Sequence, residues 1–325
     1  MLNYQFSKEI KKELRALIGS NNYRGIIGIV YDFVMISVSI ILTNFSWWFY
    51  PLALLIIGSR QRALATILHD AAHNCLAKNK KLNYILGTFF SGYLIGQEFK
   101  NYKLSHVKGH HAHLGDKEKD PDYKYHLQVG LYDIGDKRQF LVKYLIKPIF
   151  LLNIVSYLSY VFKNRMLQYK IAPREYLIMF LYWILILLTL FYFSALHFFL
   201  LFWIVPYITT FSILGWFIEM AEHYPLVHEN NESLYMTRNR FSNWLESFFL
   251  SGHSENFHLT HHLMPSIPYW NISKAHKIMM KDKLYRDFNE QMGGVFFSSN
   301  KNKPIMFDLI VNRKFPILNK FQQVK

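Results

Sequence analysis

Residues 255–262 read Glu-Asn-Phe-His-Leu-Thr-His-His, in a chain of 325 residues that contains 15 histidines. Side chains three and four positions apart share one face of a helix, so His258 lies beside both His261 and His262 if the segment is helical. Imidazole is the commonest metal ligand and suits iron, copper, nickel and zinc. The stretch therefore predicts a short helix whose three imidazoles converge on a metal site.

Two upstream clusters and a single histidine extend this prediction. Residues 69–73 read HDAAH and residues 106–111 read HVKGHH, and both contain a pair at the one-turn spacing of a helix. Zinc proteases share that spacing but place glutamate beside the first histidine, where this chain has Asp70. His223 directly follows the last long apolar run. The predicted metal ligands are His69, His73, His106, His110, His111, His223, His258, His261 and His262.

Nine histidines exceed the ligands of one first-row ion, so the set predicts two ions. Redox-inert zinc has little use for such a site, whereas iron can activate O₂. Nearby acids can orient the imidazoles through their other ring nitrogen. The candidates for that role are Asp70, Asp116, Asp120, Asp122, Glu222 and Glu255. Paired Glu-xx-His motifs of carboxylate-bridged di-iron bundles are a competing pattern, but only Glu255–His258 fits it. No side chain is predicted to be catalytic beyond the metal ligands.

The composition indicates a membrane protein. Hydrophobic residues make up 51% of the chain and charged residues 18%, below the quarter usual in soluble domains. The net charge of +15 comes from basic residues that flank apolar runs, which favours anionic lipid headgroups over nucleic acid as the partner. We expect an all-α integral membrane protein with about four transmembrane helices, built as a single domain over residues 1–325. The expected spans are residues 25–43, 45–67, 176–194 and 198–218, and the expected cap is residues 68–175 and 219–325.

Charge predicts the orientation of these spans. The expected connections at residues 44–46 and near His197 contain no lysine or arginine. The positive-inside rule then places the opposite, basic side in the cytoplasm, together with the histidine clusters. The second span is expected to continue as one helix that emerges into water near Arg60 and Arg62 and then carries His69 and His73.

The motifs HDAAH, HVKGHH and HLTHH, with EHYPL at residues 222–226, resemble those of the membrane fatty acid desaturase family and its hydroxylase relatives. The resemblance runs from about Arg60 to His276. It implies a cytosolic helical cap that holds a di-iron centre on the nine histidines named above. It also implies O₂-dependent oxidation of an unactivated C–H bond. No His-Pro-Gly-Gly segment is present, so electrons are expected from a separate ferredoxin, cytochrome b5 or flavoprotein reductase.

One departure leaves the reaction open. Three residues separate His106 from His110, whereas many acyl desaturases have two, and this spacing is similar to that of membrane alkane hydroxylases. The expected function is desaturation of a fatty acyl or similar lipid chain in lipid metabolism. The alternatives are hydroxylation of an alkyl, lipid or small apolar substrate and, more distantly, metal binding or transport. The substrate and its carrier, the regiochemistry, the electron donor, the oligomeric state and the roles of His113 and His253 stay undetermined.

Overall fold

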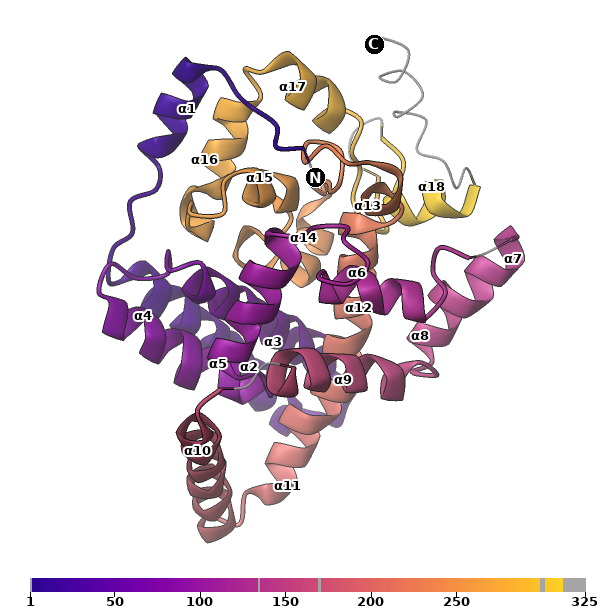
Figure 1. The fold of residues 1–325 in the computed structure, drawn as a ribbon. Coiled ribbons are helices and arrows are strands. Elements are labelled where there is room, and N and C mark those ends of the chain that lie inside the picture. The colour runs from indigo at the N-terminus through magenta and orange to yellow at the C-terminus, as the bar shows by residue number, and fades with distance from the viewer. Residues whose placement is uncertain (1, 134, 169–170, 299–301, 312–325) are drawn as a thin grey trace. The chain divides into compact units, whose positions relative to one another are not determined.

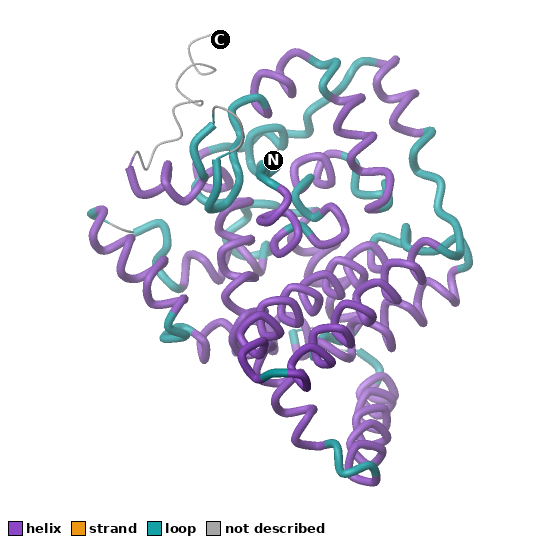
Figure 2. The backbone as a smooth tube through the Cα atoms, turned by 180° about the vertical axis from the view of Figure 1, so that it is seen from behind, coloured by secondary structure: helices purple, strands orange, loops and turns teal. Residues whose placement is uncertain are grey.

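The computed structural model describes residues 2–133, 135–168, 171–298 and 302–311. Every regular element within these residues is a helix, as Figures 1 and 2 show, which confirms the all-helical prediction. The chain forms two compact units, each assembled from separate stretches of sequence. Unit 1 contains Met1–Ser20, Lys108–Leu152 and Trp216–Lys325, and unit 2 contains Asn21–Val107 and Asn153–Gly215.

Four helical runs within the described residues are long and apolar enough to cross a membrane, as predicted. They are Arg24–Phe45, Trp47–Ala72, Pro173–Tyr192 and Leu196–Glu229. Each overlaps one expected span. The last run extends 11 residues beyond the expected end at residue 218, because α12 (Ser212–His223) and α13 (Leu226–Glu229) continue the helical path.

Helix α3 is the centre of unit 2. It packs against α2, α4, α5 and the π-helical segments η2 and η8. Most of its side chains are buried, from Ala53 through Ala72. The helices of this unit are α2 (Arg24–Phe45), α3 (Tyr50–Ala72), α4 (Lys80–Gly87), α5 (Phe99–Lys103), α9 (Ile154–Phe162), α10 (Pro173–Tyr192) and α11 (Leu196–Phe199). Its π-helical segments include η2 (Thr88–Gly92), η6 (Lys163–Leu167), η7 (Leu200–Ile204) and η8 (Tyr207–Phe211).

The expectation that α3 emerges into water near its arginines is wrong at Arg60. The Arg60 side chain is buried, and its Nη1 lies 3.5 Å from Oδ1 of the fully buried Asp32 on α2. The neighbouring Gln61 is also fully buried and donates to the Trp203 carbonyl at 2.9 Å. Groups on adjacent helices therefore contact these two side chains in place of water, a pattern that buried charges require.

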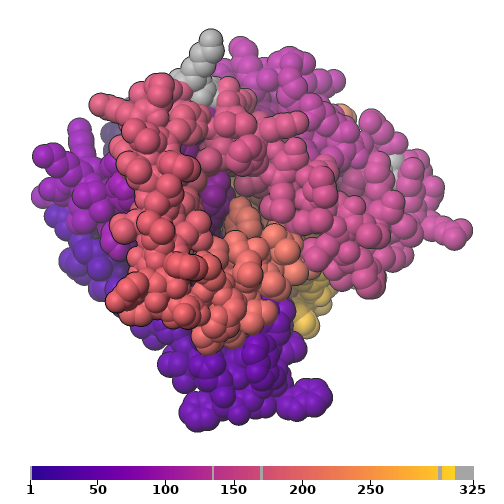
Figure 3. All heavy atoms as spheres, turned by 90° about the horizontal axis from the view of Figure 1, so that it is seen from below, coloured from indigo at the N-terminus to yellow at the C-terminus, as the bar shows by residue number. Residues whose placement is uncertain are grey.

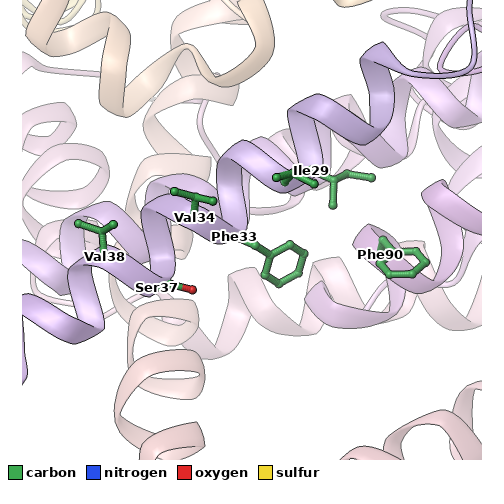
Figure 4. Close-up of a pocket in the computed structure, with 7 residues that line it drawn as sticks. Ile29, Phe33, Val34, Ser37, Val38 and Phe90 are labelled. Carbon is green, nitrogen blue, oxygen red and sulfur yellow. The ribbon is translucent and has the colours of Figure 1, made fainter.

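The outer helices of unit 2 expose apolar side chains. Only Glu175 and Met179 of α10 are buried, and Figure 3 shows this helix at the surface in the red part of the colour scale. Side chains of α2 and Phe90 line an open groove of about 460 Å³ in which Ser37 is the single polar residue (Figure 4). Exposed apolar surface of this extent fits contact with lipid chains.

Leu114, Tyr123, Val227 and Met236 form a buried hydrophobic cluster in unit 1. Helix α1 lies against α16, where Asn271 Nδ2 donates to the Leu17 carbonyl at 3.0 Å. The remaining helices are α6 (Pro121–Gln128), α7 (Lys137–Phe140), α8 (Lys147–Ile149), α14 (Trp244–Leu250), α15 (His258–Leu263), α16 (Tyr269–Met279), α17 (Lys283–Asn289) and α18 (Ile305–Val311), with α1 at Lys8–Arg15.

Candidate metal centre

Four of the predicted ligands meet within unit 1. His223 ends α12, His258 and His262 stand one turn apart on α15, and His110 comes from the π-helical segment η4 (Leu104–His111). Their donor atoms lie within 4.8 Å of one another. His258 Nε2 is 2.9 Å from His223 Nε2 and 3.0 Å from His262 Nε2. We call these four residues the tetrad.

The arrangement of the tetrad nitrogen atoms suits coordination of a metal ion better than hydrogen bonds between the rings. A neutral imidazole has one N–H and one lone pair, so His258 Nε2 cannot form a good hydrogen bond with two facing Nε2 atoms at once. A cation at their centre would accept a lone pair from each ring. Imidazole donors suit first-row transition metals.

Carboxylates occupy the opposite nitrogen of two tetrad rings. Glu222 Oε2 lies 3.3 Å from His258 Nδ1, and Asp120 Oδ1 lies 3.0 Å from His110 Nδ1. Asp122 Oδ2 is 3.6 Å from the same His110 nitrogen. We therefore assign the ring proton to Nδ1, which leaves the Nε2 lone pair directed toward the other histidines. This is the orienting role that the sequence suggested for Glu222, Asp120 and Asp122.

The tetrad environment also favours uncharged rings. Burial lowers the pKa of His262 well below its ordinary value, and the neighbouring His111, His258, His110 and His223 lower it further. Neutral imidazole is the form that binds metal. The His262 ring is thus held in its neutral form at neutral pH.

The prediction that His258, His261 and His262 converge on one point is wrong for His261. Its ring centroid is 6.5 Å from that of His258, whereas the His262 centroid is 4.5 Å away. His261 Nε2 instead faces His111 Nε2 at 3.1 Å. Adjacent residues on an α-helix point about 100° apart, so His261 and His262 cannot share a direction.

Unit 2 contains its own set of predicted ligands. The ring centroids of His69 and His73 are 4.8 Å apart, and the His106 centroid lies 4.8 Å from His69 and 5.7 Å from His73. Asp70 Oδ1 is 3.2 Å from His69 Nδ1, so a carboxylate contacts Nδ1 here as it does at His258 and His110. The three donor atoms lie within 4.8 Å of one another.

The expected pairing of His106 with His110 does not occur. The sequence predicted one face of an α-helix, but residues 104–111 are π-helical. The donor atoms of His106 and His110 belong to different groups of candidate metal ligands. His106 accordingly joins the set of unit 2, and His110 joins the tetrad of unit 1.

A sequence model of the family described as fatty acid desaturase matches residues 45–291, well over half of the chain. The chain belongs to the fatty acid desaturase family.

A curated member supports the same conclusion over a longer stretch. The dihydrorhizobitoxine desaturase of Bradyrhizobium elkanii is 41% identical to this chain over 317 residues, which are 95% of this chain and 90% of the relative. The family resemblance predicted from the histidine motifs is thus confirmed. This fatty acid desaturase family member is a desaturase-like oxidoreductase, and its four apolar helices indicate a membrane protein.

Two histidines that the sequence left undetermined, His113 and His253, lie outside the groups of described residues that could hold a metal ion. The His113 backbone N–H donates to the Gly109 carbonyl at 3.0 Å. The His253 ring lies 4.7 Å from the Tyr269 ring. Asp116, one of the acids suggested to orient the ligands, instead accepts hydrogen bonds from the backbone N–H groups of Glu118 and Lys119.

Residues that hold the ligands in place were missed by the sequence reasoning. Arg240 binds the Glu222 carboxylate through Nε at 3.0 Å and Nη2 at 2.9 Å. In unit 2 the Tyr102 ring stacks on His106 at 5.2 Å, and the Arg165 guanidinium lies 5.2 Å above the Tyr102 ring. No spacing signal links these residues to the ligands, because each contact is formed only by the fold.

Proposed function

We propose that this family member is an O₂-dependent oxidoreductase that uses the nine predicted histidines to hold two iron ions. The observation that supports this proposal is the tetrad, in which four histidine donor atoms lie within 4.8 Å of one another and carboxylates contact the other ring nitrogen of His258 and His110. One iron binds at the tetrad, and the other takes its ligands from the remaining predicted histidines. Bound iron supplies the O₂ activation needed to oxidise an unactivated C–H bond.

The proposed reaction is the removal of two hydrogen atoms from adjacent carbons to form a double bond. The two hydrogen atoms from the substrate, O₂, two electrons from a separate donor and two protons leave together as two molecules of water, which balances this step. The protein side chains act as ligands and orienting groups. The ferredoxin, cytochrome b5 or flavoprotein reductase expected from the sequence is the proposed electron donor.

For the substrate, we propose dihydrorhizobitoxine or a compound of similar structure. The support is the 41% identity to a protein named for that reaction, which extends over almost the whole chain. A fatty acyl chain is the second candidate, because the family is named for fatty acids and the outer helices of unit 2 offer apolar surface. Hydroxylation is the alternative outcome for either substrate, since HVKGHH keeps the hydroxylase-like spacing.

The substrate proposal is tested with purified, iron-loaded protein in detergent, supplied with O₂, ferredoxin and ferredoxin reductase. Dihydrorhizobitoxine and a saturated fatty acyl substrate are incubated separately, and products are identified by mass spectrometry. A product two mass units lighter than dihydrorhizobitoxine supports the proposal. A product sixteen mass units heavier identifies hydroxylation, and turnover of the acyl substrate alone overturns the proposed substrate.

The metal proposal is tested by iron content per chain in wild type, His258→Ala and the control His113→Ala. We expect wild type and the control to retain about two irons per chain and His258→Ala to retain less, because His258 contacts both His223 and His262 in the tetrad. Zinc in place of iron, or equal iron in all three proteins, contradicts the proposal.

We also propose a multi-pass arrangement in the membrane with the metal centre on the cytoplasmic side. The support is the distribution of basic residues, which are missing from residues 44–46 and from the turn before α11.

A further inference from the structure

Helix α15 carries three predicted ligands but is only six residues long. Helices shorter than about 12–15 residues are marginal by themselves in water. Its N-cap residue, Phe257, makes no side-chain capping hydrogen bond. The first amides of such a helix need acceptors from elsewhere. The direction in which its histidines point must therefore be set by contacts from other parts of unit 1.

The missing cap is supplied by Asn239, which lies 21 residues before Thr260 in the sequence. Asn239 Oδ1 accepts from the Thr260 backbone N–H at 3.1 Å, at the third residue of α15. The Thr260 side chain also lies 3.1 Å from Asn239 Nδ2. Both residues are fully buried. Asn239 thus acts as a helix cap delivered from a distant segment.

The orientation of the Asn239 amide is itself fixed. Its Nδ2 donates to Asn289 Oδ1 at 2.6 Å and to the Tyr285 hydroxyl at 2.9 Å. These bonds keep Nδ2 on Asn289 and Tyr285 and leave the carbonyl oxygen to accept from the Thr260 backbone N–H. The Tyr285 hydroxyl lies 2.7 Å from Thr260 Oγ1 and 2.8 Å from His276 Nδ1, which closes the network.

This network holds the face of α15 that lies away from the tetrad. Thr260 is two residues from His258 and two from His262. Measured in one direction around the helix, it lies about 200° from His258 and about 160° from His262, on the opposite side of α15 from both. A small rotation of α15 about its axis would therefore move both tetrad nitrogens together. Fully satisfied buried polar networks rigidify their surroundings, and here the rigid element is the one that carries the ligands.

The segment that contains Asn239 also joins α15 to α12. The Arg238 backbone N–H donates to the Glu222 carbonyl at 3.1 Å, and the Arg240 backbone N–H donates to the Asn256 carbonyl at 2.8 Å. Arg238, Asn239 and Arg240 thus connect the end of α12, which carries His223, with α15, which carries His258, His261 and His262.

We propose that Asn239 is a positioning residue that sets the rotation of α15 through Thr260, and so decides that His258 and His262 face the tetrad while His261 faces His111. Tyr285 and Asn289 hold Asn239 in the required orientation. This inference rests on the proposed function, because it assigns the tetrad to a metal ion.

The test uses Co²⁺ as the probe with the purified, metal-free full chain in detergent. Affinity is measured by titration, and the visible absorption of bound Co²⁺ reports the geometry of its ligands. For Asn239→Leu we expect Co²⁺ affinity to fall by about 10- to 100-fold, the usual effect of removing groups that orient metal ligands. Its Co²⁺ absorption spectrum should also differ from that of wild type. Thr260→Ser keeps the hydroxyl and the backbone N–H and should retain the wild-type affinity and spectrum.

The control is Tyr144→Phe, which removes a hydroxyl of unit 1 that donates to the Val129 carbonyl at 2.8 Å, away from the Asn239 network. It should leave Co²⁺ binding unchanged. If Asn239→Leu does not fold, Tyr285→Phe provides the second variant, because it removes one partner of Asn239 and preserves the ring that packs against Phe6. It should change the affinity and the spectrum in the same direction by a smaller amount.

The outcomes separate this inference from the proposed function. Failure of wild type to bind Co²⁺ overturns the metal site and the positioning role together. Normal binding by wild type, with wild-type affinity and spectrum in folded Asn239→Leu or Tyr285→Phe, overturns the positioning role alone.

Discussion

The Glu222 carboxylate contacts two side chains with different roles. Arg240 binds one of its oxygens at 2.9–3.0 Å, and His258 Nδ1 lies 3.3 Å from the other. All three side chains are largely shielded from water. The arginine keeps the carboxylate in place, and the carboxylate keeps the His258 ring turned toward the tetrad. The same arrangement, a carboxylate on Nδ1, recurs at His110 and His69.

Glu222→Gln should weaken both contacts. The substitution leaves the Arg240 charge buried without its counter-ion, a change that costs about 3–5 kcal/mol in buried pairs. We expect a lower thermal denaturation temperature in detergent and a lower iron content per chain than in wild type. Glu118→Gln is the control, because its exposed pair with Lys124 is of the kind that contributes about 0–1 kcal/mol. Equal stability and iron content in wild type and Glu222→Gln would contradict the role of this carboxylate.

His276 predicts a pH dependence of stability. Burial lowers its pKa from 6.5 to about 4, with a smaller effect from Lys277. Between these two values the unfolded chain binds a proton that the folded chain does not, so the folded state loses stability as the pH falls from 6.5 to 4. The contribution is on the order of 1–3 kcal/mol and is fully present above pH 6.5.

The comparison is the thermal denaturation temperature of metal-free wild type and His276→Gln between pH 7.5 and pH 4. We expect the variant to lose less stability than wild type across this window, since it has no imidazole to protonate. Parallel curves for the two proteins would show that His276 does not titrate as its burial predicts.

Two short elements decide how the histidines are distributed. His106 and His110 both lie on the π-helical segment η4 but belong to different groups of candidate ligands, and the rotation of α15 turns His261 away from His258. On α15 the separation arises because adjacent residues of an α-helix point about 100° apart. A long, central helix such as α3 has less freedom, because other helices surround it.

Gly58 tests the packing of α3 within unit 2. A Cβ atom at this position would lie 2.5 Å from Thr210 Cβ and 2.8 Å from the Phe211 backbone nitrogen on η8. Small residues allow such close approach of helices in membranes. We expect Gly58→Ala to lower the thermal denaturation temperature in detergent, consistent with an overpacking cost of about 1–3 kcal/mol.

Gly19→Ala is the matched control, since no other atom lies within 4 Å of the added carbon. It should leave the denaturation temperature within error of wild type. A Gly58→Ala protein as stable as wild type would show that α3 and η8 can separate without cost.

At the scale of the whole molecule, the four apolar helices and the distribution of charge predict how the chain crosses the membrane. The apolar runs are interrupted by short connections, one after Phe45 and one after Tyr192. Both connections lack lysine and arginine, whereas the long segments between and after the spans contain many. The positive-inside rule therefore predicts that the short connections face away from the cytoplasm.

This topology is measurable with single cysteines in a Cys75→Ala background. Asn44→Cys lies at the end of α2, and Lys117→Cys lies on the predicted cytoplasmic side; both positions are exposed. A membrane-impermeant maleimide should label Asn44→Cys in intact cells and should label Lys117→Cys only after permeabilisation. Labelling of Lys117→Cys in intact cells would reverse the predicted orientation.

Local patterns in the sequence were sufficient for the helical class, the four apolar helices and the family. Apolar runs of membrane-spanning length and histidines at one-turn spacing are properties of neighbouring residues, so they can be read before the fold is known. The acids that contact the histidines, including Asp70 and Glu222, could also be identified from the sequence, because they lie next to or near the predicted ligands.

Tertiary structure alone decided which ligands meet and what holds them. The sequence paired His106 with His110 and gathered His258, His261 and His262 at one point. In the fold His106 and His261 belong to a different group of candidate ligands from His110, His258 and His262, because the direction of each side chain depends on packing. Arg60 was expected in water but is paired with Asp32, and Asn239 caps a helix that lies 21 residues away. These contacts join segments that are distant in sequence, and no local spacing encodes a partner that only folding brings within hydrogen-bond distance.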